Sequence, residues 1–213
     1  MNDAVLITRA LHFAAERHSN QRRKGRAQEP YINHLAEVAA LVVQATEGED
    51  ANLVAAALLH DTIEDTATQP EELASIFNHD VAALVQEVTD DKSLTKKNRK
   101  DLQVTNAPKK SNRVKILKLA DKTSNLRSIA NSPPENWDKE RKREYIQWSV
   151  RVADGLNGVN SWLEARFQEA LKEALDSKNE KQVGDAKTQP TVDGAKDQGQ
   201  TEIVSAGEEV PSI

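Results

Sequence analysis

Apolar residues recur at steps of three and four along most of the chain, the spacing that gathers side chains on one face of an α-helix. A first helix is predicted from Val5, Ala10, Leu11, Ala14 and Ala15. A second is predicted from Leu35, Val38, Ala39, Leu41, Val42 and Val43, with Asn33 as its N-cap. Residues 53–59 (LVAAALL) are apolar on every side, which indicates a central buried helix.

Further helices are predicted downstream. Pro70 begins a short helix over residues 71–77. The next apolar stripe consists of Val81, Leu84, Val85 and Val88. A long helix, which ends before Pro133, is predicted from Val114, Leu117, Leu119, Ala120, Leu126 and Ile129. We expect one closing helix over residues 145–175, with Gly155 and Gly158 as the place for a bend. No stretch alternates as a strand would, so the fold class is all-α, a helical bundle.

Composition changes this picture at the C-terminal end. The chain has 213 residues, a length that suggests one domain with an appendage. Its mean hydropathy of -0.68 is polar for a compact domain. Residues 177–213 lower this mean, because they contain no aromatic residue and no helical period. We therefore expect an ordered domain over residues 1–176 and a disordered polar tail over residues 177–213, whose composition names no partner.

Charge is also unevenly distributed. The tail holds four lysines and seven acidic residues, a net of -3, which leaves -2 for the rest of a chain whose total is -5. A nearly neutral body argues against a general binder of nucleic acid. Residues 92–118, however, contain ten basic residues and one acidic residue. This run is either a solvated basic face or a rim that attracts a small, highly charged anion.

The chain has no cysteine, which excludes disulfides, thiolate catalysis and cysteine-based zinc sites. Its first turns carry Asp3, Arg9 and Glu16, so no signal peptide is predicted. No apolar run reaches the roughly 20 residues that span a bilayer. We expect a cytoplasmic protein with no membrane partner.

Polar residues interrupt the apolar pattern at one place above all. His60 and Asp61 directly follow the most apolar run of the chain, and a buried carboxylate costs several kcal/mol unless it is paired or binds a cation. The alternative is a helix that simply reaches the surface at His60. Glu64 lies four residues after His60, and Asp65 four after Asp61, so four ionisable groups would share two adjacent helical rows. Such crowding of like charges favours a functional site.

Two other polar residues join this set. Asp121 lies on the apolar stripe of its helix, in step with Val114, Leu117, Asn125 and Ser128. Asp121 either forms a salt bridge or binds a metal ion. His34 opens the second apolar helix. Two imidazoles and two carboxylates suit Mn²⁺ or a similar divalent ion with open positions, and they disfavour a closed structural zinc site.

The order of these residues resembles the H…HD…D pattern of the HD phosphohydrolase superfamily. Longer stretches make the resemblance specific: RRK at 22–24, PYINH at 30–34, AALLHDTIEDT at 56–66, EVTDDKSL at 87–94 and KLADKTSNLRSI at 118–129. They resemble the hydrolase domain of RelA/SpoT proteins, and most closely the stand-alone small alarmone hydrolases of the metazoan SpoT-homologue type. The resemblance covers the chain from about residue 3 to about residue 172.

The resemblance implies a metal-dependent hydrolase that removes the 3′-pyrophosphate of guanosine tetra- and pentaphosphate (ppGpp and pppGpp), leaving GDP or GTP. It also implies that Glu64 and Asp65 handle the attacking water, and which of the two is the main base stays open. It implies a Mn²⁺ ion held by His34, His60, Asp61 and Asp121. Such an ion would neutralise phosphoryl charge and acidify water, which the hydrolysis of an anionic pyrophosphate requires.

The resemblance further assigns residues to the nucleotide. Arg23 and Lys24 would contact the guanine, although the spacer over residues 25–29 differs from the shorter one of the long bifunctional enzymes. Asn125 would lie at the sugar, and Ser128 stands where relatives often carry threonine. Tyr31 is either a pocket wall or a core residue. The candidates for the 5′-phosphates are Lys96, Lys97, Arg99 and Lys100.

Alternatives of other classes remain. One is a related nucleotide phosphohydrolase, such as an NADPH 2′-phosphatase, because a 2′-phosphate would reach the same metal. Another is a non-catalytic nucleotide-binding HD protein, which the presence of every ligand and of the Glu64–Asp65 pair disfavours. Since no synthetase domain follows, we expect a protein that degrades the alarmone without making it.

Overall fold

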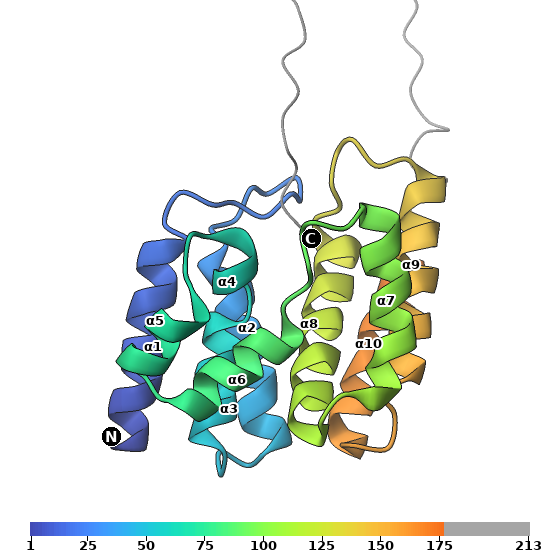
Figure 1. Cartoon of the computed structure of the whole chain (residues 1–213). Coiled ribbons are helices and arrows are strands. Elements are labelled where there is room, and N and C mark those ends of the chain that lie inside the picture. The colour runs from blue at the N-terminus through green and yellow to red at the C-terminus, as the bar shows by residue number, and fades with distance from the viewer. Residues whose placement is uncertain (177–213) are drawn as a thin grey trace, which may run out of the picture.

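Helices follow one another through residues 1–176, the part of the chain that the computed structural model describes (Figure 1). The helices are α1 (Asp3–Arg17), α2 (Ile32–Ala45), α3 (Ala51–Leu59), α4 (Thr62–Asp65), α5 (Pro70–Ile76), α6 (His79–Val88), α7 (Lys96–Asn106), α8 (Asn112–Asn131), α9 (Lys139–Asp154) and α10 (Ser161–Asp176). A short 3-10 helix, η1 (Ala107–Lys109), precedes α8. No strand longer than an isolated bridge occurs in these residues, which confirms the all-α prediction. The tail predicted over residues 177–213 lies outside the described part.

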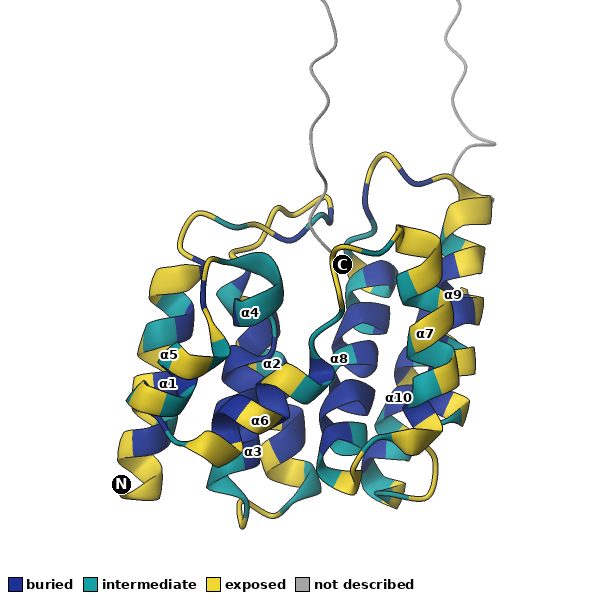
Figure 2. Ribbon diagram, in the orientation of Figure 1, coloured by how far each residue is buried: buried dark blue, intermediate teal, exposed yellow. Residues whose placement is uncertain are grey.

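Helix α8 runs through the middle of the bundle, with α2 packed on one side and α10 on the other (Figure 1). Helices α1, α3, α5 and α6 continue the first side, where α3 contacts α1, α2 and α6. On the other side, α7 and α9 lie beside each other and α9 contacts α8. The dark-blue residues of Figure 2 show that α3 and α8 form the centre of the core.

The sequence of α3 explains its central position. All residues from Leu53 to Leu59 are buried, as the apolar run predicts. The helix begins at a cap, because the side chain of Asp50 accepts a hydrogen bond from Leu53 N at 3.0 Å. Around it, α1 buries Leu6, Ala10 and Ala14. The predicted stripe of α1 was therefore partly wrong, since Val5 is 47% exposed.

The start of α2 also differs from the prediction. Tyr31 occupies the N-cap position with helical backbone angles, and it makes no side-chain capping bond. Asn33 lies inside the first turn, where its N–H donates to Pro30 O at 3.0 Å. Asn33 as N-cap was wrong, because the backbone is already helical before it and leaves no extended residue there.

The predicted closing helix is two helices, α9 and α10, separated by residues 155–160. Gly155 packs so closely that an added Cβ would lie 2.7 Å from Ala107 Cβ. Gly158 has φ +85°, a left-handed conformation that favours glycine. These glycines end one helix and redirect the chain, where a bend had been expected.

Helix α7 was not predicted at all, because it buries no residue and so has no apolar period. Its start is marked only by Thr95, whose side chain accepts from Asn98 N at 3.3 Å. Among residues 1–176, no helix combines the length and the apolar content needed to cross a bilayer.

Candidate metal centre and active site

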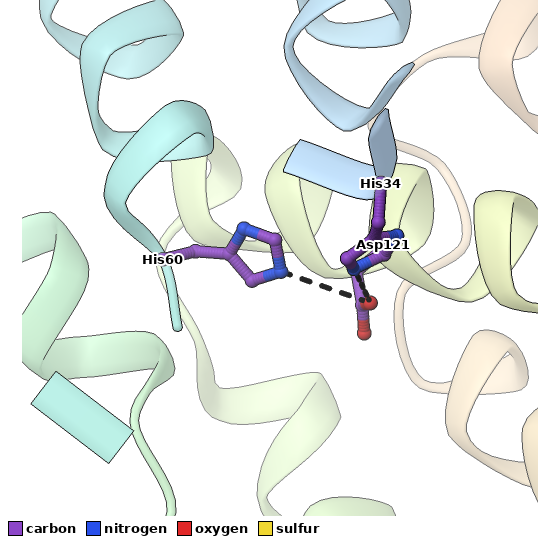
Figure 3. A group of neighbouring side chains, drawn as sticks. All are labelled: His34, His60 and Asp121. Carbon is purple, nitrogen blue, oxygen red and sulfur yellow. Dashed lines mark ion pairs between the residues drawn. The ribbon is translucent and has the colours of Figure 1, made fainter. Parts of the chain in front are cut away.

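Three segments far apart in the sequence converge beside the middle of α8. His34 comes from the first turn of α2, His60 from the end of α3 and Asp121 from α8, and each offers an atom within 4.8 Å of the others. Asp121 Oδ1 lies 3.4 Å from His34 Nε2 and 3.8 Å from His60 Nε2. Figure 3 shows both rings pointing at this carboxylate.

Asp61 completes the predicted ligand set at the edge of this group. Its Oδ2 lies 3.1 Å from His60 Nε2 and 3.8 Å from His34 Nε2. The same oxygen accepts a hydrogen bond from the hydroxyl of Tyr31 at 2.8 Å. Two histidine nitrogens and Asp121 thus converge on one point with Asp61 beside them, a donor set that fits a divalent transition metal.

The end of α3 brings His60 and Asp61 to this point. The helix ends at Leu59, and Thr62–Asp65 forms a separate turn, α4. His60 Nδ1 donates to Ala57 O at 2.8 Å, and Thr62 Oγ1 donates to Leu59 O at 2.6 Å. These bonds satisfy carbonyls that the last turn leaves open. The prediction of continuous helical rows through Glu64 and Asp65 was therefore wrong.

The hydrogen bonds of His60 give a direct test of the metal's fit. A carbonyl only accepts, so Nδ1 carries the proton in the neutral ring and Nε2 offers a lone pair. That buried Nε2 makes no well-aligned hydrogen bond to the described residues, although Asp61 is close. An orphaned buried nitrogen facing two carboxylates is the arrangement that a metal ion satisfies.

The charged groups of the centre favour the binding of a cation. Burial by itself lowers the pKa of His60, but the negative charges of the nearby Asp61 and Asp121 raise it to about 10. Burial and the charge of Arg23 lower the pKa of His34 to about 4. Burial would raise the pKa of Asp61, yet His60 holds it below its usual range. Both carboxylates therefore stay ionised and attract a cation.

Two cavities lie beside the centre. The larger has a volume of about 560 Å³, and His60, Asp61, Glu64 and Asp121 form part of its wall. The basic residues that line it are Lys96, Lys97, Arg99, Lys100, Lys118, Lys122 and Arg141. The smaller has a volume of about 300 Å³. It brings together the predicted residues Arg23, Lys24, Tyr31, Asp65 and Ser128.

A family model described as "HD domain" matches residues 10–148. The guanosine-3′,5′-bis(diphosphate) 3′-pyrophosphohydrolase MESH1 of Xenopus tropicalis is 48% identical over 166 residues, which cover 78% of this chain and 93% of the relative. The chain belongs to the HD-domain family. The MESH1 protein of Danio rerio, with the same enzyme name, is 44% identical over 172 residues, 81% of this chain and 96% of its own.

A solved structure agrees with this assignment. It is described as a metazoan ortholog of SpoT that hydrolyzes ppGpp, and it is 42% identical to this HD-domain chain with a TM-score of 0.76. The match covers 79% of this chain and 94% of that one. The predicted family resemblance is thereby confirmed.

The two acidic residues of the HD-domain motif that were expected to handle water lie on different sides of the centre. Glu64 lines the larger cavity, and its Oε1 is 3.5 Å from Arg99 Nη1. Asp65 lines the smaller cavity, and its Oδ1 is 2.6 Å from Lys92 Nζ. Burial and the nearby charge of Asp61 raise the pKa of Asp65.

Asn125 lies deeper in the HD-domain core than the predicted sugar contact suggests. It is 1% exposed and lines neither of these two cavities. Its Nδ2 donates to Asp121 Oδ1 at 2.7 Å, so it holds the carboxylate that faces both histidines. Its Oδ1 is buried without a hydrogen-bond partner among residues 1–176.

The basic residues of the run over residues 92–118 lie in two different surroundings. Arg113 forms ion pairs with Asp50 at 2.7 Å and with Asp80 at 2.8 Å, which connect α8 to the N-cap of α3 and to the first turn of α6. In contrast, residues of α7 turn their basic side chains toward the larger cavity. The basic residues of α7 thus lie where the predicted rim requires them, whereas Arg113 is engaged in ion pairs within the fold.

Sequence reasoning missed Lys122, which directly follows Asp121. Its Nζ lies 2.9 Å from Asp121 Oδ2 and 4.6 Å from the ring centroid of Trp148, and the residue is 3% exposed. Lys100 Nζ also lies over the ring of Trp148, 4.7 Å from its centroid. A lysine inside a buried helical stretch was the available signal, because such a residue needs a partner. The aromatic wall from α9 had no such signal, since residues 145–175 were predicted only as a closing helix.

Proposed function

We propose that this chain hydrolyses the 3′-pyrophosphate of ppGpp and pppGpp, which yields pyrophosphate with GDP or GTP. One observation carries the proposal: the two-histidine, two-carboxylate centre borders a cavity whose wall holds both an acidic residue and a set of basic side chains. The names of the MESH1 relatives support the same substrate class.

The charge of the larger cavity supports a highly anionic substrate. Seven basic residues line it, from α7, α8 and α9. A pyrophosphate ester repels nucleophiles, so its hydrolysis depends on fixed positive charge around the phosphoryl oxygens. Lys96, Lys97 and Arg141 supply such charge in the wall of this cavity, and they suit the phosphates of the nucleotide.

His34, His60, Asp61 and Asp121 would hold the ion, and the mixed nitrogen and oxygen set suits Mn²⁺. When bound, the ion supplies positive charge to the phosphoryl group and lowers the pKa of a water molecule. The chain's own groups then orient the reactants. Asn125 and Lys122 fix the two oxygens of Asp121, at 2.7 Å and 2.9 Å, so that this carboxylate keeps one orientation.

Glu64 is the group that receives the proton of the attacking water. It shares the larger cavity with His60, Asp61 and Asp121, whereas Asp65 faces the smaller cavity. A general base must lie within hydrogen-bond reach of the proton it takes, so this placement favours Glu64. Asp65, paired with Lys92, supports the position of the nucleoside beside it.

The smaller cavity suits the guanosine. Arg23 offers a planar guanidinium that stacks on a base, and Lys24, Tyr31 and Ser128 line the same space. Burial and the charge of Lys96 lower the pKa of Lys24 to about 8, so it is mostly charged at neutral pH. Asn125 is buried and lines neither cavity, so we assign it to holding Asp121 and place no sugar contact on it.

The experiment is a hydrolysis assay of the purified protein with ppGpp and Mn²⁺, followed by ion-exchange chromatography of the products. We expect GDP and pyrophosphate, and we expect chelator, Asp61→Ala and Glu64→Gln each to abolish their release. Glu71→Gln, at an exposed acid in the first turn of α5, is the matched control and should keep full activity. A chain ending at Asp176 should keep its kcat, because the proposed domain is residues 1–176.

Two results would overturn the proposal. If ppGpp stays intact while Mn²⁺ is bound, the alarmone is not the substrate. If the same preparation removes the 2′-phosphate of NADPH, NADPH replaces ppGpp as the proposed substrate. Equal activity of Glu64→Gln and the wild type would remove Glu64 as the base, and Asp65→Asn would then be tested in its place.

A further inference from the structure

A chain of hydrogen bonds extends from His34 away from the metal centre. Ser124 Oγ lies 2.8 Å from His34 Nδ1 and 2.7 Å from Glu37 Oε2. Glu37 Oε1 in turn accepts from Arg127 Nη1 at 2.9 Å. Ser124 is fully buried and His34 is 3% exposed, so water does not compete for the first bond.

The protons of this chain have one consistent assignment. A carboxylate only accepts hydrogen bonds, so the single hydroxyl proton of Ser124 goes to Glu37. Ser124 Oγ must then accept from His34, which places a proton on Nδ1. In the neutral ring, Nε2 keeps its lone pair, and this is the atom that lies 3.4 Å from Asp121 Oδ1.

The same bonds connect the helices that carry the ligands. Glu37 lies one turn after His34 on α2, while Ser124 and Arg127 follow Asp121 on α8. The relay therefore fixes the ring of His34 relative to Asp121 and places a carboxylate behind it. In metal sites, a hydrogen bond to the second nitrogen of a ligating histidine selects its tautomer and increases its basicity.

We propose that Ser124 and Glu37 are positioning residues for His34, and that they increase the affinity of the centre for its divalent ion. The inference rests on the proposed metal-dependent function and adds residues outside the ligand set. A purely structural role would instead make Ser124 a packing contact between α2 and α8, with an effect on stability alone. Metal affinity separates the two roles.

The first test measures Mn²⁺ binding to the full-length, chelator-treated protein by calorimetry. We expect Ser124→Ala to raise the Mn²⁺ Kd about 10-fold to 100-fold. Hydrolysis by this variant should recover toward the wild-type kcat at saturating Mn²⁺. Ser149→Ala is the matched control, because Ser149 is also fully buried but lies on α9, where its Oγ donates to Tyr145 O at 3.0 Å. It should keep the wild-type Kd.

The second test uses a double-mutant cycle. Glu37→Gln keeps an acceptor for Ser124 and removes the charge, so we expect a smaller rise in Kd than with Ser124→Ala. Because Glu37 acts through Ser124, Glu37→Gln should have no added effect in the Ser124→Ala background. Should Ser124→Ala fail to fold, Glu37→Gln remains informative, since the Glu37 side chain is 36% exposed.

A wild-type Mn²⁺ Kd in both single variants would overturn the relay, and so would additive effects in the double variant. Failure of the proposed function gives a different pattern. Wild-type protein that binds Mn²⁺ and leaves ppGpp intact would contradict the substrate, while a raised Kd in Ser124→Ala would still support the relay.

Discussion

At the scale of single residues, Tyr31 serves two parts of the site at once. It lines the smaller cavity, and its hydroxyl donates to Asp61 Oδ2 at 2.8 Å. Its ring stacks on that of His18, with centroids 5.2 Å apart. Burial and the charge of Asp61 raise the pKa of Tyr31 well above its usual value, so the hydroxyl stays protonated and keeps donating. The alternatives of pocket wall and core residue are both correct.

Tyr31→Phe removes this hydroxyl and little else. We expect the Mn²⁺ Kd to rise about 10-fold, because one oxygen of a ligand loses its hydrogen bond. Stability should fall by only about 1 kcal/mol. Calorimetry with Mn²⁺ and thermal unfolding check the two parts. Tyr145→Phe is the matched control, since the hydroxyl of Tyr145 has no hydrogen-bond partner in the described chain, and its Mn²⁺ Kd should not change.

The lowered pKa of Lys24 predicts that kcat/KM for ppGpp depends on pH. Its pKa is lowered to about 8 by burial and by the charge of Lys96, and lysine is charged below its pKa. The value of kcat/KM for ppGpp should therefore be highest below pH 8 and should fall as pH rises through that value. In Lys24→Arg, whose guanidinium stays charged, this fall should disappear. An unchanged fall in that variant would assign it to another group.

At the scale of elements, the loop before α2 and the loop after α8 close the smaller cavity together. Gly25 forms a bridge to Pro134, and Ala27 N donates to Ser132 Oγ at 2.8 Å. A Cβ on Gly25 would lie 2.2 Å from the backbone oxygen of Ser132. Such a contact forces the two loops apart, so glycine is required where the backbones meet.

Gly25→Ala should therefore widen the cavity that we assign to guanosine. We expect a higher KM for ppGpp with a smaller change in kcat, and a loss of about 1–3 kcal/mol in stability. Gly48→Ala is the matched control. Gly48 has φ +76° and no neighbour within 4 Å of an added Cβ, so its substitution should reduce stability and leave KM unchanged. Equal KM values in both variants would contradict the assignment.

At the scale of the whole molecule, the proposed metal would connect helices α2, α3 and α8 at one point. His34 belongs to α2, His60 ends α3 and Asp121 belongs to α8. These ligands do not lie together in the unfolded chain, so an ion that binds them binds the native state. Metal binding and folding are therefore coupled.

Mn²⁺ should accordingly stabilise the fold. At about 100 times its Kd, we expect a gain of about 2.7 kcal/mol. For a domain of this size, that corresponds to a rise in Tm of about 5–10 °C. Thermal unfolding with Mn²⁺ and with chelator measures it. Asp121→Asn should lose most of the rise, and an equal rise in that variant would place the ion elsewhere.

The sequence by itself determined the helical class and most of the helices, and it singled out His34, His60 and Asp121, which the structure brings together. Apolar periodicity is a local property, so α3 and α8 could be predicted from their own residues. Polar residues that interrupt such a pattern are visible for the same reason, which is how His60 and Asp121 were found. Asn33 and the closing helix were wrong because caps and glycine breaks depend on backbone angles that neighbours set.

Only the tertiary structure decided which distant residues meet. Helix α7 has no fully buried residue, and one of its contacts to α9 is the hydrogen bond that Trp148 Nε1 donates to Lys100 O at 3.1 Å. The contact of Lys122 with Trp148 and the bonds of Ser124 with Glu37 join residues on different helices. Periodicity reports which face of a helix is buried and carries no information about what covers it. The packing of α8 against α2 and α9 supplies that information, and with it the surroundings of the site.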